Sequence, residues 1–373
     1  MKVYFTFAFF LITTFSFSQV DLEWSIDFGG GSFDDSRSIA MDNNNNLIVV
    51  GTFRDTVDFD PGPGSNIRIS NGMRDIYVLK ADPLGNVLWV KTYGGIGFDE
   101  ANNVAIDASG SIYITGEFDN TVDFDPGPGI HNETQTTNVF FVQKLDEDGL
   151  FQWVNITTCS DPNGSACSGD DISVNSANDI YITGTFHGTV DMDPGADVSN
   201  LTGTTPNPSD VYIQKLDQNG NFIWAASYGD SLSDFPRDIH IDLDDNIYVT
   251  GMTQKTAGNS GNIFLWKCSN SGSQIWSFDF GDSGFNNQGR SVVTNSVGDV
   301  YLAGSFEGTA DLEPGSGVLL ESSNGGADGL IQKYDSTGTL IWSNYFGSSS
   351  ADIASKLTID SNDELYIGGY LGG

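Results

Sequence analysis

Positive charge is scarce in this sequence. Its 373 residues include 15 Lys and Arg against 50 Asp and Glu, which gives a formal net charge of −35. Nucleic-acid binding depends on clustered Lys and Arg that contact phosphates, so this composition argues against a nucleic-acid partner. A large negative charge keeps a secreted protein soluble, and it would also suit cations or basic partners. Both explanations of the charge stay open.

Cysteine and histidine are rare as well, with three residues of each. No Cys and His cluster has the spacing of a zinc site, and no His stands in a hydrolase or metalloprotease motif. Cys159 and Cys167 are close together in a loop rich in Gly, Ser and Asn. They could form a local disulfide in an oxidising compartment. Cys268 stands alone in an apolar run, where it is expected to be a small buried residue.

Long apolar runs are confined to the N-terminus. The chain begins with Met1-Lys2 and then runs apolar to about Phe17. A short positive start, an apolar centre and small residues before a cut are typical of a secretory signal peptide, and the run is too short for a spanning helix. We therefore expect a signal peptide over residues 1–18, a mature start at Gln19, and a secreted or cell-surface protein. An uncleaved anchor is the alternative, and no later stretch could span a bilayer.

Glycine, by contrast, is abundant, with 45 residues. Short runs of Val, Ile, Phe, Tyr and Trp lie between turns rich in Gly, Asn, Asp and Ser, and this composition is typical of an all-β protein. The segment Val57–Gly64 reads Val-Asp-Phe-Asp-Pro-Gly-Pro-Gly and is repeated letter for letter at Val122–Gly129, with looser copies from Val190 and from Ala310. A sequence that repeats at a fixed period is typical of a protein built from repeated structural units.

Each repeated unit contains four short strand-like runs joined by tight turns. One run holds a Trp in each of six copies, which are Trp24, Trp89, Trp153, Trp224, Trp276 and Trp342. Another run ends in a Gly in all six copies, which are Gly51, Gly116, Gly184, Gly251, Gly304 and Gly369. A Gly at a fixed place indicates a backbone position that a neighbour crowds, or one with positive φ.

Four strands per unit predict an all-β β-propeller with four-stranded antiparallel blades. Stacked sandwiches or a solenoid are the alternatives, but solenoid coils are shorter than these units. We expect one repeat domain over residues 19–373 with about six blades. The last unit stops at Gly373 before its third strand, whereas Asp21–Gly29 supplies an additional Trp strand that suits ring closure. The last blade is therefore expected to be incomplete, either in a fragment or in a chain that another chain completes.

The repeated motifs also resemble a known family. These motifs are Trp-x-x-x-(Tyr/Phe)-Gly-Gly, (Ile/Val)-Tyr-(Ile/Val)-Thr-Gly, Val-Asp-Phe-Asp-Pro-Gly and Lys-Leu-Asp-x-x-Gly. Together they resemble the SBBP-type β-propeller repeat, in the long-blade version of secreted and surface proteins from Bacteroidetes-like bacteria. The resemblance covers Asp21 to Gly373, although the fourth unit lacks the Asp-Pro-Gly element. It implies a propeller fold and export, and it carries no catalytic residues over.

The Asp-x-Asp-Pro-Gly segments are the first candidate site. In an extended segment Asp58 and Asp60 point to one side and Phe59 to the other. Two carboxylates, with backbone carbonyls freed by Pro and Gly, could bind Ca²⁺. The tentative ligands are Asp58, Asp60, Asp123, Asp125, Asp191, Asp193, Asp311 and Glu313. Alternatively, the Asp residues only cap turns that Pro and Gly shape.

Two further polar sets recur too regularly for an active site. The first set lies eight residues before the Asp that ends a strand, and we expect it to have a structural hydrogen-bonding role; its members are Asp34, Asp99, Asp234 and Asp352. The second set is expected to pair with carboxylates or to guard a sheet edge; its members are Lys80, Lys144, Lys215, Lys267 and Lys333.

The sequence shows no singular polar constellation, and 50 acidic residues make chance carboxylate pairs uninformative. We therefore predict a non-enzymatic, exported binding or display module that recognises a protein or glycan at one face of the ring, with Ca²⁺ as a candidate stabilising ion. One alternative is a propeller enzyme, a glycan hydrolase or lyase, with its acidic residues confined to the inner strand of one blade. The other is a structural spacer of a larger adhesin.

Overall fold

A computed structural model describes residues 24–158, 167–204, 208–254, 261–281 and 284–373, and every regular element within them is a strand. The described residues hold no helix long and apolar enough to cross a membrane. The predicted signal peptide and Cys159 lie outside these ranges, so the predicted bridge between Cys159 and Cys167 stays a prediction.

Five four-stranded antiparallel sheets follow one another along the chain, and a two-stranded sheet follows them. We number them blades 1 to 6. The first strands are β2 (Asp35–Met41), β8 (Glu100–Ile106), β12 (Asp171–Val174), β18 (Asp234–Ile241), β22 (Gln288–Thr294) and β28 (Asp352–Ile359). The second strands are β3 (Leu47–Phe53), β9 (Ile112–Asp123), β13 (Ile180–Phe186), β19 (Ile247–Gln254), β23 (Val300–Phe306) and β29 (Leu365–Leu371).

The third and fourth strands complete blades 1 to 5. The third strands are β6 (Asp75–Ala81), β10 (Asn132–Leu145), β16 (Asp210–Leu216), β20 (Gly261–Cys268) and β26 (Asp328–Tyr334). The fourth strands, which carry the Trp residues, are β7 (Val87–Tyr93), β11 (Phe151–Thr157), β17 (Phe222–Tyr228), β21 (Gln274–Phe280) and β27 (Leu340–Phe346). Small side sheets consist of β1 (Gly29–Gly30), β4 (Thr56–Asp58) and β5 (Ile67–Ile69), of β14 (Thr189–Asp191) and β15 (Asn200–Thr202), and of β24 (Thr309–Asp311) and β25 (Leu320–Ser322).

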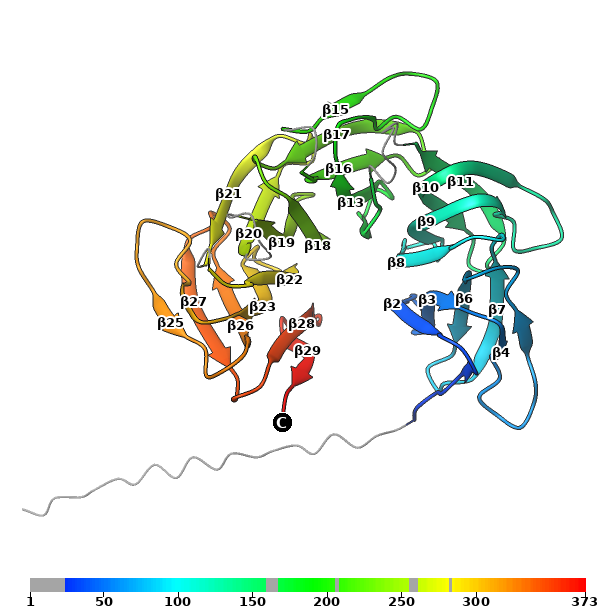
Figure 1. Ribbon diagram of the computed structural model, residues 1–373, viewed down its shortest axis with the longest axis horizontal. Coiled ribbons are helices and arrows are strands. Elements are labelled where there is room, and N and C mark those ends of the chain that lie inside the picture. The colour runs from blue at the N-terminus through cyan, green and yellow to red at the C-terminus, as the bar shows by residue number, and fades with distance from the viewer. Residues whose placement is uncertain (1–23, 159–166, 205–207, 255–260, 282–283) are drawn as a thin grey trace, which may run out of the picture.

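The blades are arranged around a common axis, with their first strands nearest the centre and their fourth strands at the rim (Figure 1). This arrangement confirms the predicted β-propeller of four-stranded antiparallel blades. The ring is open between blade 6 and blade 1 (Figure 1). In the part of the chain that the structure describes, blade 6 consists of β28 and β29 alone, as the repeat count predicted.

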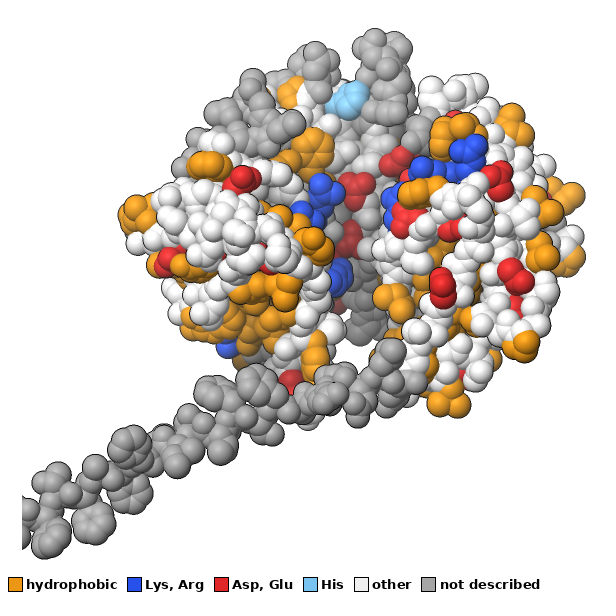
Figure 2. Space-filling model, turned by 60° about the horizontal axis from the view of Figure 1, so that its bottom comes forward, with side chains coloured by type: hydrophobic (Ala, Val, Ile, Leu, Met, Phe, Trp, Pro, Cys, Tyr) orange, Lys and Arg blue, Asp and Glu red, His pale blue; other side chains and the backbone are white. Residues whose placement is uncertain are grey.

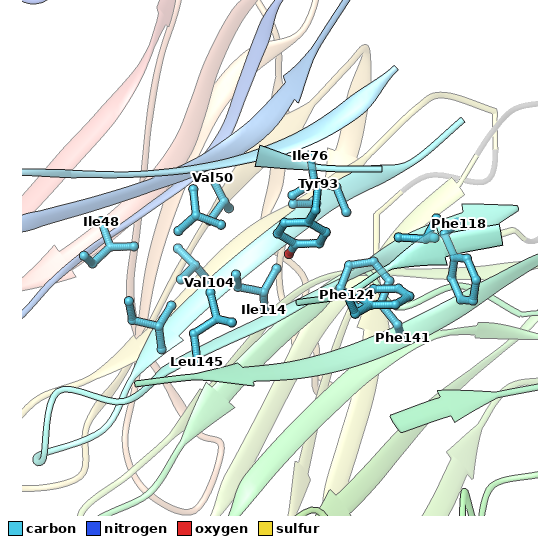
Figure 3. Close-up of a cluster of buried hydrophobic side chains, with 14 of the residues drawn as sticks. Ile48, Val50, Ile76, Tyr93, Val104, Ile114, Phe118, Phe124, Phe141 and Leu145 are labelled. Carbon is cyan, nitrogen blue, oxygen red and sulfur yellow. The ribbon is translucent and has the colours of Figure 1, made fainter. Parts of the chain in front are cut away.

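Apolar side chains from neighbouring blades interdigitate to form the core, because each sheet buries both faces. Between blades 1 and 2, Ile48 and Val50 of β3 face Val104 and Ile114 of blade 2 (Figure 3), and all four are buried. Each fully buried Val, Ile, Leu or Phe stabilises the fold by about 1.5–3 kcal/mol. Cys268 belongs to such a cluster, is buried and is a free thiol, as predicted.

The segment 24–28 packs against blade 1. In the other blades, the fourth strand of one blade packs against the next blade in the same way. The indole of Trp24 donates a hydrogen bond to the Pro83 carbonyl at 3.0 Å, in the turn between β6 and β7. Trp224 of β17 donates equivalently to Asn270 of the next blade, also at 3.0 Å. Residues 24–28 thus occupy the place of a fourth strand for a blade that precedes blade 1. The apolar face of blade 1 is left open beside it, where Ile39 is 60% exposed.

The Gly that ends each second strand lies against the backbone of the first strand. A Cβ at Gly116 would lie 1.9 Å from the carbonyl oxygen of Glu100, and a Cβ at Gly251 would lie 2.0 Å from that of Phe235. No positive φ occurs at these two positions. Crowding by a neighbouring strand, one of the two predicted explanations, is therefore the correct one.

Candidate functional site

The Asp-x-Asp-Pro-Gly segments form closed turns on the connection from the second to the third strand. Asp58 Oδ1 accepts backbone hydrogen bonds from Asp60 at 3.1 Å and Asn66 at 2.7 Å, and Asp60 Oδ1 accepts one from Gly62 at 2.7 Å. These backbone donors lower the pKa of Asp58. The same bonds recur at Asp123, Asp125, Asp191, Asp193, Asp311 and Glu313.

The residue between the two acids is buried, as the strand pattern predicted. Phe59, Phe124, Met192 and Leu312 are each 0% exposed. In three of these loops the backbone carbonyl of the buried residue also has a partner, because it accepts the side-chain amide of Gln143, Gln214 or Gln332. Capping and packing therefore account for this motif.

Calcium binding at these loops stays a prediction. Within the described ranges no three His, Cys, Asp or Glu side chains lie together as a metal site. The eight tentative ligands lie in four separate loops, so the structure does not bring them together into one centre.

The acidic residues between blades brace the loops, as predicted. The Oδ2 atoms of Asp34 and Asp99 each accept the backbone N–H of the residue four positions earlier at 2.7 Å, and Asp234 and Asp352 repeat this bond at 3.1 and 2.6 Å. Burial raises the pKa of Asp99 and of Asp234 to about 7.

The repeated Lys residues lie on third strands inside the sheets and not at a sheet edge. Three of them pair with carboxylates, as predicted, and Lys144 and Lys267 donate to backbone carbonyls. The Nζ atoms of Lys80, Lys215 and Lys333 lie 3.0, 2.7 and 2.7 Å from Asp42, Asp179 and Asp299. Lys144, Lys215, Lys267 and Lys333 also lie over Tyr rings at about 5 Å. These contacts hold neighbouring strands and turns together.

The first strands carry a feature that the repeat pattern did not reveal. Their pairing to the second strands shifts register by one residue in blades 1, 2, 4, 5 and 6, which marks a β-bulge. The bulged residues are Arg37, Asn102, Arg237, Arg290 and Ser355, and Asp170 precedes β12 at the same place. A β-bulge re-aims a side chain and often lies beside a functional site.

The residue after each bulge connects one blade to the next. Asp171 Oδ2 accepts the backbone N–H of Ile239 at 2.8 Å, Asp238 Oδ2 accepts that of Val292 at 2.6 Å, and Ser291 Oγ accepts that of Leu357 at 3.1 Å. Lys356 of β28 forms an ion pair with Asp238. Burial raises the pKa of Asp171. These bonds hold the first strands in place around the axis.

Four of the six positions line one cavity at the centre of the ring, and the six positions do not all hold the same residue type. A cavity of about 310 Å³ is lined by Arg37, Asn102, Asp170 and Arg237 together with Glu100 and Glu117. Burial raises the pKa of Asp170 to about 6, although the charge of Arg237 opposes this shift. Figure 2 shows basic and acidic side chains gathered in the hollow at the middle of the ring. This group of polar side chains does not follow the repeat, and the repeated motifs did not predict it.

Sequence reasoning missed this site because it searched for residues that repeat. Every other polar set described above recurs from blade to blade, whereas the bulged position holds Arg, Asn, Asp, Arg, Arg and Ser in turn. One sequence signal could have revealed the site. Each first strand contains one residue more than strict alternation of apolar and polar residues allows, and comparing the residue at that position across the six units shows that its type varies.

A comparison with protein families identifies one of the units. Residues 223–256 match the model of the SBBP family, described as a β-propeller repeat. Residues 223–256 are an SBBP β-propeller repeat. They contain nearly all of β17, and the whole of β18 and β19, and therefore include the bulged Arg237. The SBBP resemblance inferred from the motifs is thereby confirmed for this unit.

One curated relative of this chain is an uncharacterized WD repeat-containing protein of Acanthamoeba polyphaga mimivirus. It is 21% identical over 435 aligned residues, which cover 93% of this chain and 31% of that protein. The chain thus spans about a third of the length of this relative.

Solved structures with similar arrangements include a gluconolactonase from Xanthomonas campestris and a glucose dehydrogenase. The gluconolactonase has a TM-score of 0.40 and 14% identity over 90% of this chain and 82% of its own. The glucose dehydrogenase has a TM-score of 0.44 and 9% identity over 92% of this chain and 94% of its own. The fold assignment rests on the sheets of this chain and on its SBBP repeat.

Proposed function

We propose that this chain is an exported, non-enzymatic β-propeller that binds a ligand in its central channel. The observation that carries the proposal is the contrast between polar groups that recur in almost every blade and a bulged position whose side chain varies among Arg, Asn, Asp and Ser. Repeated groups brace every blade, whereas a ligand site needs a particular set of polar groups in one place. Arg37, Asn102, Asp170 and Arg237 supply such a set on first strands that the cross-blade hydrogen bonds hold. Export rests on the signal-peptide pattern of residues 1–18.

A preformed site of this kind suits recognition. Side chains on packed strands lose little freedom when a ligand binds, so more of the interaction free energy appears as affinity. A cavity of about 310 Å³ is at the lower end of the range for small-molecule sites. A cavity of this volume can hold one sugar unit or one side chain of a larger ligand.

A second candidate function is a glycan hydrolase or lyase, and Asp170 favours it. Burial raises the pKa of this carboxyl to about 6, which is in the range of a general acid that works near neutral pH. Asp170 immediately precedes the first strand of blade 3 and lines the cavity, which is where an enzyme of this kind would hold a catalytic carboxyl.

The test is a screen of residues 19–373 against insoluble and soluble polysaccharides and surface proteins, with binding and product release measured in the same samples. We expect binding without turnover, and we expect Asp170→Asn to weaken binding. Asp60→Asn, in a capped turn away from the channel lining, serves as the matched control and should bind normally. Product release that Asp170→Asn abolishes would replace the binding module with the enzyme. Equal binding by both variants would place the site outside the channel.

A further inference from the structure

We propose that Arg237 and Arg290 anchor a carboxylate in the central channel, and that the ligand is an acidic sugar unit of the uronic acid type. This inference rests on the proposed function and specifies its ligand class. The two residues are the bulged positions of the neighbouring strands β18 and β22. Arg237 lines the cavity described above, and Arg290 holds the equivalent position in the next blade, close enough for the charge of Arg237 to act on it.

Among the residues that the structure describes, no carboxylate lies within salt-bridge distance of either guanidinium, although the charge of Arg237 acts on Asp170. No salt bridge or hydrogen bond joins either one to a described residue, and the Nε atom of Arg290 is buried without a hydrogen-bond acceptor. By contrast, Arg37 lies 2.6 Å from Asp35 and 3.1 Å from Glu100, and Arg74 also pairs with Glu100. In a chain with 50 Asp and Glu, two Arg side chains on neighbouring first strands without a short ion pair are an exception that favours an anionic ligand.

The charges of the two residues act on each other. Burial and then the charge of Arg237 lower the pKa of Arg290. A bound anion would relieve this repulsion and would give the buried Nε atom an acceptor. A planar guanidinium fork matches the two oxygens of a carboxylate, and such bidentate pairs are among the strongest hydrogen bonds in proteins.

The rest of the cavity restricts the ligand to a single negative charge. Glu100, Glu117 and Asp170 line the same space as Arg237, and they would repel a phosphate or a run of sulfates. Carboxylates accept hydrogen bonds from hydroxyl groups, and a sugar ring carries several hydroxyl groups. A ligand with one carboxylate and neighbouring hydroxyl groups is therefore complementary to both kinds of side chain. An amino acid, whose ammonium group would face Asp170, is the competing source of a carboxylate.

The experiment is calorimetric or NMR titration of residues 19–373 with sodium glucuronate, glucose and glycine at low ionic strength. We expect glucuronate to bind at least tenfold more tightly than glucose, because glucose lacks the carboxylate, and more tightly than glycine. Arg237→Gln and Arg290→Gln should each weaken glucuronate binding at least fivefold, whereas Arg237→Lys should keep part of the affinity. Arg54→Gln, at an exposed position on a connecting segment, is the matched control and should change nothing.

The outcomes separate this inference from the function on which it rests. Equal binding of glucose and glucuronate, lost in Asp170→Asn, would leave the channel as a sugar site and overturn the carboxylate anchor. Tighter binding of glycine would overturn the sugar. Glucuronate binding that both Gln variants retain would also overturn the inference, provided that circular dichroism shows both variants folded. Absence of binding for all three ligands, together with no ligand in the wider screen, would remove the proposed function as well.

Discussion

The Gly that ends the second strand of blade 4 offers the sharpest test of the inner-strand geometry. In Gly251→Ala the new Cβ would lie 2.0 Å from the carbonyl oxygen of Phe235 and 2.7 Å from Cε1 of Phe264, where side-chain carbons need at least 3.0 Å. The oxygen must therefore move by about 1 Å to reach that minimum separation. Phe235 lies two residues before the bulged Arg237, so the movement distorts the bulge.

The expected free-energy change combines three contributions of known size. Overpacking costs about 1–3 kcal/mol, and weakening one backbone hydrogen bond costs about 0.5–1.5 kcal/mol. Replacing Gly by Ala also restricts the unfolded chain, which stabilises the native state by about 0.4–1 kcal/mol. The net expectation is a destabilisation of roughly 0.5–4 kcal/mol, centred near 2 kcal/mol.

The assay is urea unfolding of wild type and variant, followed by tryptophan fluorescence, with sugar binding measured on the folded variant. The control is Gly31→Ala, where a Cβ meets nothing within 4 Å and the change should stay within about 1 kcal/mol. If Gly251→Ala were as stable as wild type or more stable, the crowding and the bulge geometry inferred from it would be wrong.

Further predictions address the blade interfaces, the N-terminal segment and the loops. Burial raises the pKa of Asp99 and Asp234 from 3.8 to about 7, so at these groups the folded protein binds protons more tightly than the unfolded chain. The stability that they contribute should be fully present below about pH 4 and should be lost as the pH rises to about 7, and Asp99→Asn, which copies Asn287 of blade 5, should flatten this profile in thermal unfolding. Trp24→Ala should destabilise the fold by about 1–2 kcal/mol in urea unfolding, less than a fully buried Trp, and an unchanged midpoint would contradict its place as a fourth strand. Asp58→Ala with Asp60→Ala should lower the melting temperature more in calcium than in chelator if these loops bind the ion, and equal losses would leave only turn capping.

The sequence predicts much of this fold because its local signals agree. Alternating apolar runs, turn residues and six Trp strands specify four-stranded blades, and the recurrence of Gly at position 251 and its counterparts indicates a crowded backbone. The bracing role of Asp99 follows in the same way, since a group that recurs in every blade has a role in every blade. These predictions succeed because repetition itself is the signal.

The candidate site could not be predicted in the same way. A bulge adds one residue to a strand and moves Arg237 out of the alternation that predicts which side a residue faces. The lack of an acceptor for the Nε atom of Arg290 depends on three-dimensional distances that spacing does not contain. Repetition also drew attention to Asp58 and its counterparts, whose carboxylates already accept backbone hydrogen bonds.

The central claim is that the bulged first-strand residues, and not the repeated loops, form the ligand site. A crystal structure of residues 19–373 soaked with glucuronate tests it most directly. The account predicts a sugar in the central channel, with its carboxylate within hydrogen-bond distance of Arg237 and Arg290 and its hydroxyl groups near Asp170. A sugar bound at the Asp58 turn or at another loop on the rim, with the channel arginines unchanged, would contradict it.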